Sequence, residues 1–256
     1  MNFKNKVVII TGATGGIGAE TARQFAEMGA KLCLVDLDIA KLKELAVNLH
    51  LLEEDYILKN CDVRDENAVG DYVKLTQEKF GRIDVFVNNA GIEGQVAPIH
   101  LTEDKDLSMV LDVNVKGVYY GLKYVLPIMY EQKEGSVINV ASVAGFIGSP
   151  GLAPYIASKH AVLGINKTAA LEAAASGVRV NAVCPGPVDN NMMRNIEKKA
   201  APDAPESVKE GFTQMLPLGR YATNEEVADL IIFFASEKAK YITGTAQRID
   251  GGMGAK

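Results

Sequence analysis

Cysteine and histidine are scarce in this 256-residue sequence, which has three of each and no tryptophan. The cysteines (Cys33, Cys61 and Cys184) are odd in number and far apart, so we interpret them as reduced, mostly buried side chains of a cytoplasmic protein. The histidines share no ligand spacing either. We therefore expect neither a disulfide framework nor a metal site.

Long apolar runs and an excess of positive charge are also missing. No stretch reaches the ~18 uninterrupted apolar residues that a membrane span requires. The apolar run near the N-terminus stops at Thr11-Gly12, too early for a signal peptide. Acidic side chains outnumber basic ones by 32 to 27, and the net charge of −5 offers no field that would attract phosphates. We expect a cytoplasmic protein with no nucleic-acid or membrane partner.

Short apolar runs alternate with helical patterns along the chain. The runs that we interpret as strands are Lys6–Thr11, Lys31–Asp36, Tyr56–Asn60, Ile83–Asn88, Ser136–Ala141, Val178–Cys184 and Thr245–Ile249. Helical segments such as Ala19–Met28, Ala40–Leu49 and Glu66–Phe80 lie between them. Strands that are apolar and β-branched throughout suit a parallel sheet covered on both faces. The pattern predicts an α/β protein with a doubly wound, mostly parallel seven-stranded sheet flanked by helices.

Two segments break this alternation. Glu103–Gln132 keeps apolar residues at helical spacing, which predicts one long helix that ends at about Pro127 or one turn later. Pro187–Arg220 is rich in methionine, proline and charge and lies between a strand and the next helix. Insertions of that length in a compact domain are usually lids or disordered. We find no linker or repeat, and we expect a single domain over residues 1–256 with a substrate lid at about 187–220.

A glycine-rich turn, Thr11–Gly18, directly follows the first strand and opens a helix. Gly12 permits a tight turn, Gly16 lets the backbone approach a pyrophosphate, and Gly18 lets helix and strand pack closely. The helix N-terminus then offers N–H groups and a partial positive charge to phosphates. The turn predicts a dinucleotide site, with a purely structural glycine turn as the alternative.

The second strand ends at Asp36. A carboxylate at this place accepts hydrogen bonds from the adenosine ribose hydroxyls and repels the 2′-phosphate of NADP. Neither Gly15 nor Leu37 supplies a basic group to receive that phosphate. The position therefore favours NAD over NADP, and a solvated loop acid or a helix cap is the alternative interpretation of Asp36.

With strand, glycine turn and acid in register, the chain resembles the compact branch of the short-chain dehydrogenase/reductase family over essentially its whole length. The matching residues are Thr11–Gly18, Asp62-Val63, Asn88–Gly91, Asn114, Ser142, Tyr155–Lys159, Pro185-Gly186 and Asp250–Gly252. The resemblance implies a Rossmann fold, a nicotinamide dinucleotide as the cofactor, and a reaction that interconverts an alcohol and a ketone.

Tyr155 and Lys159 lie four residues apart, on one face of a predicted helix. A free tyrosine has a pKa of about 10, and we expect the nearby ammonium and the positive nicotinamide ring to lower this pKa. Tyr155 would exchange the proton of the alcohol as general acid/base, and Lys159 would also hold the nicotinamide ribose. Ser142 follows a strand and can donate to the substrate oxygen; a cap or turn serine is the alternative.

The remaining site residues follow from the resemblance. Asn114 matches a residue that binds a water linking the lysine to solvent, and an asparagine that merely kinks the helix is the alternative. Asn190 stands where many relatives have a threonine that meets the nicotinamide carboxamide, so this contact is open, and the backbone of Val188 can replace it. The expected cofactor contacts are Gly12, Thr14, Gly15, Gly16, Ile17, Gly18, Asp36, Leu37, Asp62, Val63, Asn89, Ala90, Gly91, Tyr155, Lys159, Pro185, Gly186, Val188 and Asn190.

We expect the substrate pocket between Glu93–Val96, Ala144–Leu152 and the predicted lid. The residues expected to contact substrate are Ser142, Tyr155, Glu93, Phe146, Leu152 and Met192, with Ile147, Met193 and Met215 nearby. Each phenylalanine or methionine could equally be ordinary core. Because no arginine stands out near the catalytic set, we expect a neutral, apolar secondary alcohol or ketone, for which an alicyclic compound is one candidate. We hypothesise that Glu93 contacts a second polar group of the substrate.

Small residues are concentrated in the predicted helix Ala157–Ala174, which suits a subunit interface, and the resemblance implies a homotetramer that uses this helix and the long one before it. A buried intrachain helix is the alternative. The main rival function is an NADPH-dependent 3-oxoacyl-carrier-protein reductase, against which Asp36 argues. A non-catalytic dinucleotide sensor is the rival of a different class, and the complete catalytic set argues against it.

Overall fold

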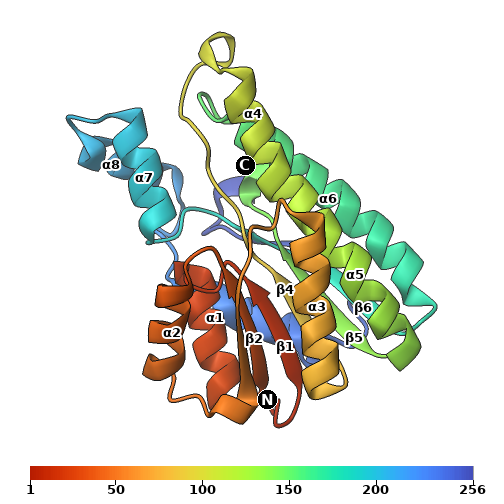
Figure 1. Cartoon of the computed structure of the whole chain (residues 1–256). Helices are drawn as coiled ribbons and strands as arrows, with labels where there is room; N and C mark the ends of the chain where they lie inside the picture. Colours follow the sequence, from red (N-terminus) through yellow and green to blue (C-terminus); the bar gives the residue numbers. More distant parts are fainter. Residues whose placement is uncertain (256) are drawn as a thin grey trace.

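The fold is a parallel sheet between two helical layers. In a computed structural model that describes residues 1–255 (Figure 1), the seven predicted strands form one sheet in the order β3-β2-β1-β4-β5-β6-β7. Their bounds are β1 Val7–Thr11, β2 Lys31–Asp36, β3 Tyr56–Asn60, β4 Val85–Asn88, β5 Gly135–Val140, β6 Val178–Pro185 and β7 Ala246–Ile249. Every neighbouring pair is parallel. The strand order reverses between β1 and β4, which is where such sheets bind ligands. The predicted doubly wound fold is confirmed.

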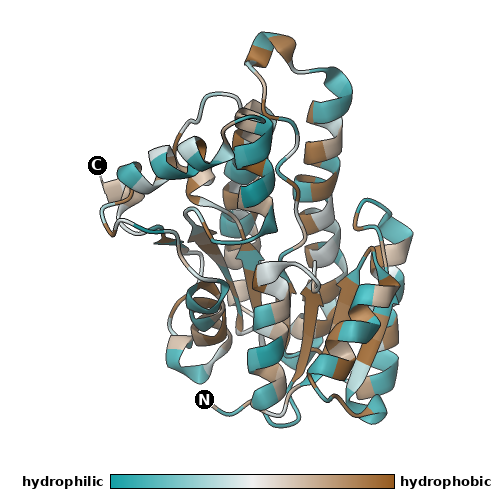
Figure 2. Ribbon diagram, turned by 90° about the vertical axis from the view of Figure 1, so that its left-hand side faces the viewer, coloured by the Kyte–Doolittle hydropathy of each residue, from teal (hydrophilic) through white to brown (hydrophobic). Residues whose placement is uncertain are grey.

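Amphipathic helices cover both faces of the sheet. One layer contains α3 (Glu66–Phe80), α5 (Gly117–Gln132) and α6 (Ala153–Ala174), and the other contains α1 (Gly16–Glu27), α2 (Ile39–Asn48) and α9 (Asn224–Ala235). Figure 2 shows almost uniformly hydrophobic strands between helices of mixed character. The long apolar runs of the sequence are therefore strands that are buried on both sides.

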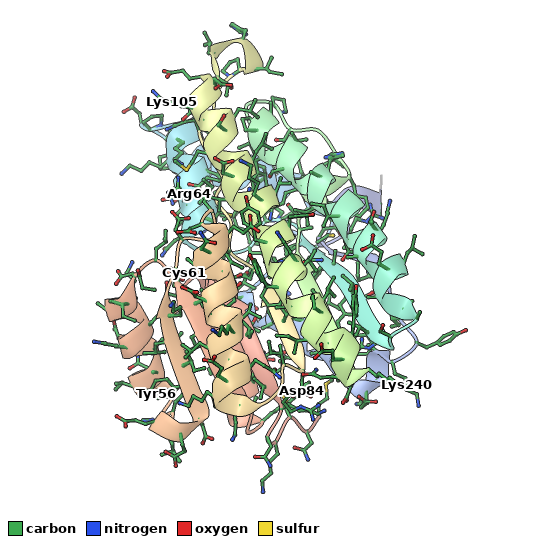
Figure 3. All side chains as sticks on the ribbon, turned by 45° about the vertical axis from the view of Figure 1, so that its right-hand side comes forward. Tyr56, Cys61, Arg64, Asp84, Lys105 and Lys240 are labelled. Atoms are coloured by element: carbon green, nitrogen blue, oxygen red, sulfur yellow. The ribbon has the colours of Figure 1, made fainter. Side chains whose placement is uncertain are left out.

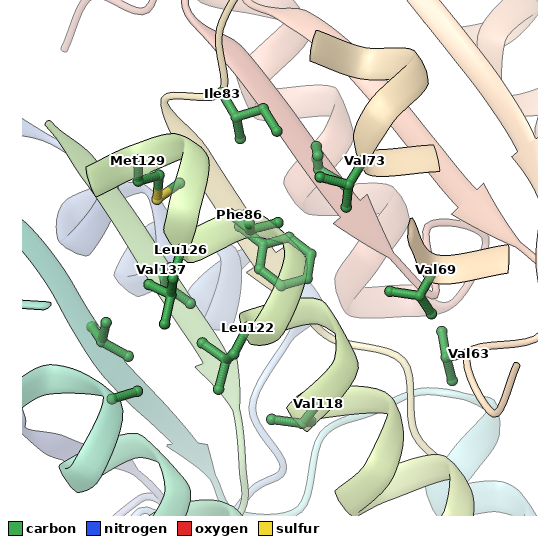
Figure 4. Close-up of a cluster of buried hydrophobic side chains, with 14 of the residues drawn as sticks. Val63, Val69, Val73, Ile83, Phe86, Val118, Leu122, Leu126, Met129 and Val137 are labelled. Carbon is green, nitrogen blue, oxygen red and sulfur yellow. The ribbon is translucent and has the colours of Figure 1, made fainter. Parts of the chain in front are cut away.

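The core between the sheet and the α3–α5 side is closely packed. Phe86 of β4 is fully buried and lies at the centre of the cluster in Figure 4, between valines of α3 and leucines of α5. Gly121 makes this approach possible, because a Cβ atom there would lie 2.5 Å from the Phe86 ring. The three cysteines are buried, as predicted.

The helix ends that were predicted correctly from the sequence are those with local capping residues. The Asp65 side chain accepts hydrogen bonds from the N–H groups of Asn67 and Ala68, and Gly81, with a φ of 77°, ends the helix. The bounds of α3 accordingly agree with the prediction. By contrast α1 begins at Gly16 and not at the predicted Ala19, because the glycine turn itself forms the first helical turn.

The predicted long helix contains an expanded turn. It begins with α4 (Asp104–Leu111), passes through a π-helical turn at Asp112–Lys116, and continues as α5 to Gln132. Its end about one turn after Pro127 agrees with the prediction. The π turn was not predicted, and such turns are frequent at functional sites.

The 187–220 insertion is largely helical. It contains α7 (Asn191–Ala200) and α8 (Pro205–Met215), which project from the layers beyond the carboxyl ends of the strands (Figure 1). Within residues 1–255, none of the helices combines the length and apolar character needed to cross a membrane.

Candidate active site

A cavity of about 850 Å³ lies at the carboxyl ends of the strands, within the usual range of ligand pockets of ~300–1,000 Å³. Segments that follow each of the seven strands, together with residues of α7 and α8, line it. The expected cofactor residues that line it are Gly12, Thr14, Gly15, Gly16, Ile17, Asp36, Leu37, Asp62, Val63, Asn89, Ala90, Gly91, Tyr155, Lys159, Pro185, Gly186, Val188 and Asn190. Gly18 and Asn114 are buried behind this surface. The sheet thus brings one predicted set from distant parts of the chain into one place.

The glycine turn leaves room that side chains would fill. A Cβ atom on Gly18 would lie 2.1 Å from the Gly12 carbonyl oxygen, and one on Gly16 would lie 2.6 Å from the Asn224 side chain. Asn89 holds the turn by donating to the carbonyls of Thr11 and Gly12 at 3.0 and 3.1 Å. The N-terminus of α1 has no side-chain cap and no acid in its first turn. Its N–H groups and the glycine cradle therefore fit a pyrophosphate.

The adenosine end of the predicted cofactor site is polar and partly exposed. Asp36 accepts hydrogen bonds from the Thr14 backbone N–H and hydroxyl at 2.9 and 2.8 Å, and from the Leu37 N–H at 2.7 Å. The cavity lining here also includes Lys41 and Arg64, which the sequence analysis missed. Lys41 lies on the first turn of α2, the helix that begins just after Asp36. The predicted start of this helix could therefore have indicated that Lys41 lies close to Asp36.

The end of the cavity that is predicted to be catalytic is built by α6, by β5 and by the turn that follows β5. Tyr155 and Lys159 lie on α6, whose start at Ala153 includes a proline in the first turn, and the Lys159 Nζ atom is 5.5 Å from the centre of the Tyr155 ring. Nζ also donates to the Val140 carbonyl of β5 at 2.9 Å. Ser142 follows β5 and lines the same cavity. Its hydroxyl accepts from the Ala144 N–H at 3.1 Å, so the cap alternative and the cavity position both hold.

Burial dominates the acid–base properties of this pair. It raises the pKa of Tyr155 to about 12, against the opposite effect of a hydrogen bond with Ser142, and Glu93 adds a smaller increase. Burial also lowers the pKa of Lys159 to about 8, because an ammonium loses its hydration there. The expected lowering of the tyrosine pKa is therefore not found in the protein alone. Phenol is the form that the folded chain favours.

Asn114 holds a loop close to Lys159, the predicted catalytic lysine. Its Oδ1 atom accepts from the Ile92 N–H at 2.8 Å, and Nδ2 donates to the Ile92 carbonyl at 2.9 Å and to the Ser158 hydroxyl at 3.0 Å. The side chain is completely buried in the π turn. A Cβ atom on Gly91 would lie 3.2 Å from Asn114 Oδ1 and 3.7 Å from Lys159 Nζ, so these groups are close together. Its water-binding role remains a prediction.

The substrate end contains most, but not all, of the expected residues. Ser142, Tyr155, Leu152 and Met192 line the cavity, as do Ile147 and Met193, with Phe212, Ile196 and Met253 as additions. Glu93, Phe146 and Met215 are not part of the lining that the described residues form. Glu93 instead pairs with Lys199 of α7 at 2.7 Å. Phe146 is 44% exposed, and the Arg248 guanidinium lies 5.7 Å from its ring.

Asn190 is the N-cap of α7. Its Oδ1 atom accepts from the N–H groups of Met192 and Met193 at 3.1 and 3.3 Å. The side chain therefore begins the projecting helix and also lines the cavity. Asn190 and Val188, the two groups considered for a contact with the nicotinamide carboxamide, both line the cavity.

Comparisons with known proteins cover nearly the whole chain. The enoyl-(acyl carrier protein) reductase family matches residues 12–254. Levodione reductase from Leifsonia aquatica is 40% identical over 255 residues, which are 99% of this chain and 96% of that protein. The 3-oxoacyl-(acyl-carrier-protein) reductase FabG from Thermotoga maritima is 39% identical over 256 residues, which are 99% of each chain.

Solved structures show the same fold. The crystal structure of levodione reductase has a TM-score of 0.96 and 39% identity and covers 99% of both chains. NAD⁺-bound xylitol dehydrogenase has a TM-score of 0.93 and 32% identity, with coverage of 98% of this chain and 100% of its own. ElxO with NADP bound has a TM-score of 0.90 and 33% identity, with 98% and 99% coverage.

Proposed function

We propose, because the chain belongs to the short-chain dehydrogenase/reductase family, that this oxidoreductase interconverts a secondary alcohol and a ketone with NAD(H). The observation that carries the proposal is the placement of Ser142, Tyr155 and Lys159 together at the buried end of a cavity whose other end contains Asp36. A non-catalytic dinucleotide sensor would not need a phenol proton donor, a buried lysine and a serine around one space.

The chain's own residues supply the proton chemistry. When bound, the nicotinamide supplies or accepts the hydride. In the reducing direction, the Tyr155 phenol donates its proton to the substrate oxygen, and the Ser142 hydroxyl donates a hydrogen bond to the same oxygen. In the oxidising direction the Tyr155 phenolate accepts the proton of the alcohol, and positive charge beside it lowers the cost of forming this phenolate. Lys159, fixed by Val140, holds a positive charge next to the ring.

Asp36 supports NAD(H) as the cofactor. Its carboxylate lines the adenosine end and disfavours a further phosphate there by repulsion. The relatives named above include one with NAD⁺ bound and one with NADP bound, so this chain's own residues must set the preference. Lys41 is the group near Asp36 that would favour the opposite choice.

A neutral, mostly apolar substrate fits the described lining. Ile147, Leu152, Met192, Met193 and Phe212 provide apolar surface, and Lys199 compensates the charge of Glu93. The names levodione reductase and xylitol dehydrogenase both describe alcohol–ketone chemistry. The FabG match supports a 3-oxoacyl-(acyl-carrier-protein) reductase as the second candidate.

The lid and the assembly are further parts of the proposal. We propose that α7 and α8 form a lid on a single-domain enzyme, since α7 carries cavity residues. We also propose a homotetramer through α5 and α6. Ala169, Ala170 and Ala173 are buried within the chain, whereas Gly164 is exposed with open space beside it, so the outer face of α6 permits a close approach. Light scattering of the purified protein measures the assembly.

Initial rates test the proposed function. A panel of cyclic and linear ketones and a 3-oxoacyl thioester is assayed with NADH and with NADPH at the nicotinamide absorbance band. We expect the highest kcat/KM with NADH and a neutral ketone. A strong preference for NADPH overturns the cofactor assignment, and turnover of the thioester alone favours the second candidate.

A further inference from the structure

Arg64 forms an ion pair and several hydrogen bonds with the carboxylate of Asp62 at the adenosine end of the cavity. The Arg64 backbone N–H and Nε donate to Oδ1 at 3.0 Å each, and Nε and Nη2 donate to Oδ2 at 2.9 and 2.5 Å. These four contacts use both oxygens twice, which is about the acceptor capacity of a carboxylate. The guanidinium also lowers the pKa of Asp62 and keeps it ionised. An adenine amino group that approaches Asp62 therefore meets an acceptor that is already engaged.

The same guanidinium also reaches α4. Nη1 lies 3.1 Å from the Sδ atom of Met109, and Figure 3 shows Arg64 above the start of α3 and beside α4. Arg64, Asp62 and Met109 all line the cavity. Each of the three guanidinium nitrogens has a partner at the edge of the planar group. The flat faces of the guanidinium are consequently the surface that it offers to a ligand.

We propose that Arg64 is a cofactor-binding residue whose guanidinium stacks on the adenine ring. The inference rests on the proposed dinucleotide function and adds to it a residue that reads the base through its flat shape. Arginine stacks on aromatic faces while its edge holds a carboxylate, which a lysine ammonium cannot do. Leu37 gives a further apolar surface at this end, and its carbonyl accepts a hydrogen bond from Asn60.

Nucleotide fragments separate this contact from the rest of the site. Calorimetric titrations with AMP, IMP, reduced nicotinamide mononucleotide and NADH are made on the wild type and on Arg64→Ala and Arg64→Lys. Arg23→Ala is the matched control, because Arg23 is also an ion-paired arginine but lies on α1 outside the cavity lining. Thermal unfolding checks that each variant is folded.

We expect Arg64→Ala to weaken the binding of AMP, IMP and NADH by the same factor of about five to ten. Reduced nicotinamide mononucleotide and Arg23→Ala should show no change, and Arg64→Lys should recover little of the loss. Unchanged AMP affinity in Arg64→Ala overturns the inference. A loss for AMP but not for IMP also overturns it, because Arg64 would then act only by orienting Asp62. A wild type that binds neither AMP nor NADH instead refutes the proposed dinucleotide function, and this inference with it.

Discussion

The two ends of the cavity satisfy their polar groups in different ways. At the adenosine end, Asp36 and Asp62 are partly exposed and are already paired with Thr14 and Arg64. At the catalytic end, Tyr155 is half-buried and Lys159 is buried, and the loss of hydration shifts the pKa of both side chains. Hydrogen bonds of the partly exposed carboxylates at the adenosine end should therefore each contribute a modest free energy to cofactor binding. At the catalytic end, by contrast, a charge on Tyr155 or Lys159 costs much more free energy because its hydration is lost. Substitutions at the two ends should differ accordingly in size and kind.

The largest expected effect is at Tyr155. Tyr155→Phe removes the proton donor and leaves the ring, so kcat should fall by about 10³-fold, within the range of general acid–base catalysis. The affinity for NADH should stay within twofold, which separates chemistry from binding. Tyr72→Phe is the control for the loss of a phenol hydroxyl elsewhere in the protein, because Tyr72 is buried on α3 and lies outside the cavity lining. If Tyr155→Phe turns over its substrate like the wild type, the catalytic assignment is wrong.

The burial of the Lys159 ammonium should make the free energy of unfolding depend on pH. Its pKa of about 8 in the folded protein lies below the ordinary value of 10.5. Between these values the unfolded chain binds more protons than the folded one, so this group makes the free energy of unfolding rise with pH. Relative to Lys159→Met, the wild type should gain about 3 kcal/mol between pH 7 and 10.5.

Urea unfolding at the two pH values measures this gain. Lys74→Met is the control, because it replaces a lysine whose side chain is 76% exposed. A constant difference between wild type and Lys159→Met across this pH range would mean that Lys159 keeps an ordinary pKa. The contrast between the buried and exposed ends would then lose its main electrostatic basis.

The sequence predicts the parts of the site that depend on local patterns better than the parts that depend on long-range pairing, and the reason is physical. The glycine turn and Asp36 depend on the ends of single strands, and α3 depends on its own Asp65 and Gly81, so local patterns define them. The π turn at Asn114 depends on Ile92, which is 22 residues away. Local helical spacing in that segment carries no information about such a partner.

Long-range pairing also explains the residues that were missed or placed elsewhere. Glu93 was expected to face the substrate, but Lys199, 106 residues later, holds its carboxylate. Arg64 makes its contact to Met109 across 45 residues. The Tyr155 pKa was expected to fall because Lys159 lies beside it. In the folded protein it rises instead, because burial by the whole fold is the dominant effect. Motif spacing therefore identifies the chemical groups, and tertiary packing decides their state.

Asp36 tests the exposed end with an effect of intermediate size. Asp36→Asn removes the charge but keeps the side-chain shape, so the ratio of kcat/KM for NADH to that for NADPH should fall by about 10- to 100-fold, as expected for the loss of hydrogen bonds to a charged group. Asp38→Asn is the control, because Asp38 caps α2 and should leave the ratio unchanged. An unchanged ratio in Asp36→Asn would assign cofactor choice to other residues, with Lys41 the first to examine.

The smallest expected effect is at the edge of the substrate end, where an exposed lysine of α7 pairs with a buried carboxylate. Lys199 of α7 donates to the Glu93 carboxylate at 2.7 Å and to the Gly94 carbonyl at 2.8 Å, so it ties the projecting helix to the loop after β4. Lys199→Met should raise KM about three- to tenfold with kcat within twofold, since the contact orders the pocket and touches no reacting atom. Lys198→Met, at the neighbouring exposed lysine of α7, is the control.

A double-mutant cycle separates this tie from a direct substrate contact of Glu93. If the two residues act only through each other, Glu93→Gln should raise KM as Lys199→Met does, and the double variant should show no further increase. Additive losses would mean that Glu93 also meets the substrate, as the sequence analysis hypothesised. A large fall in kcat in Lys199→Met would mean that this pair acts on the chemical step, because Glu93 raises the pKa of Tyr155. The residues that influence the chemical step would then extend to α7, beyond the side chains that line the cavity.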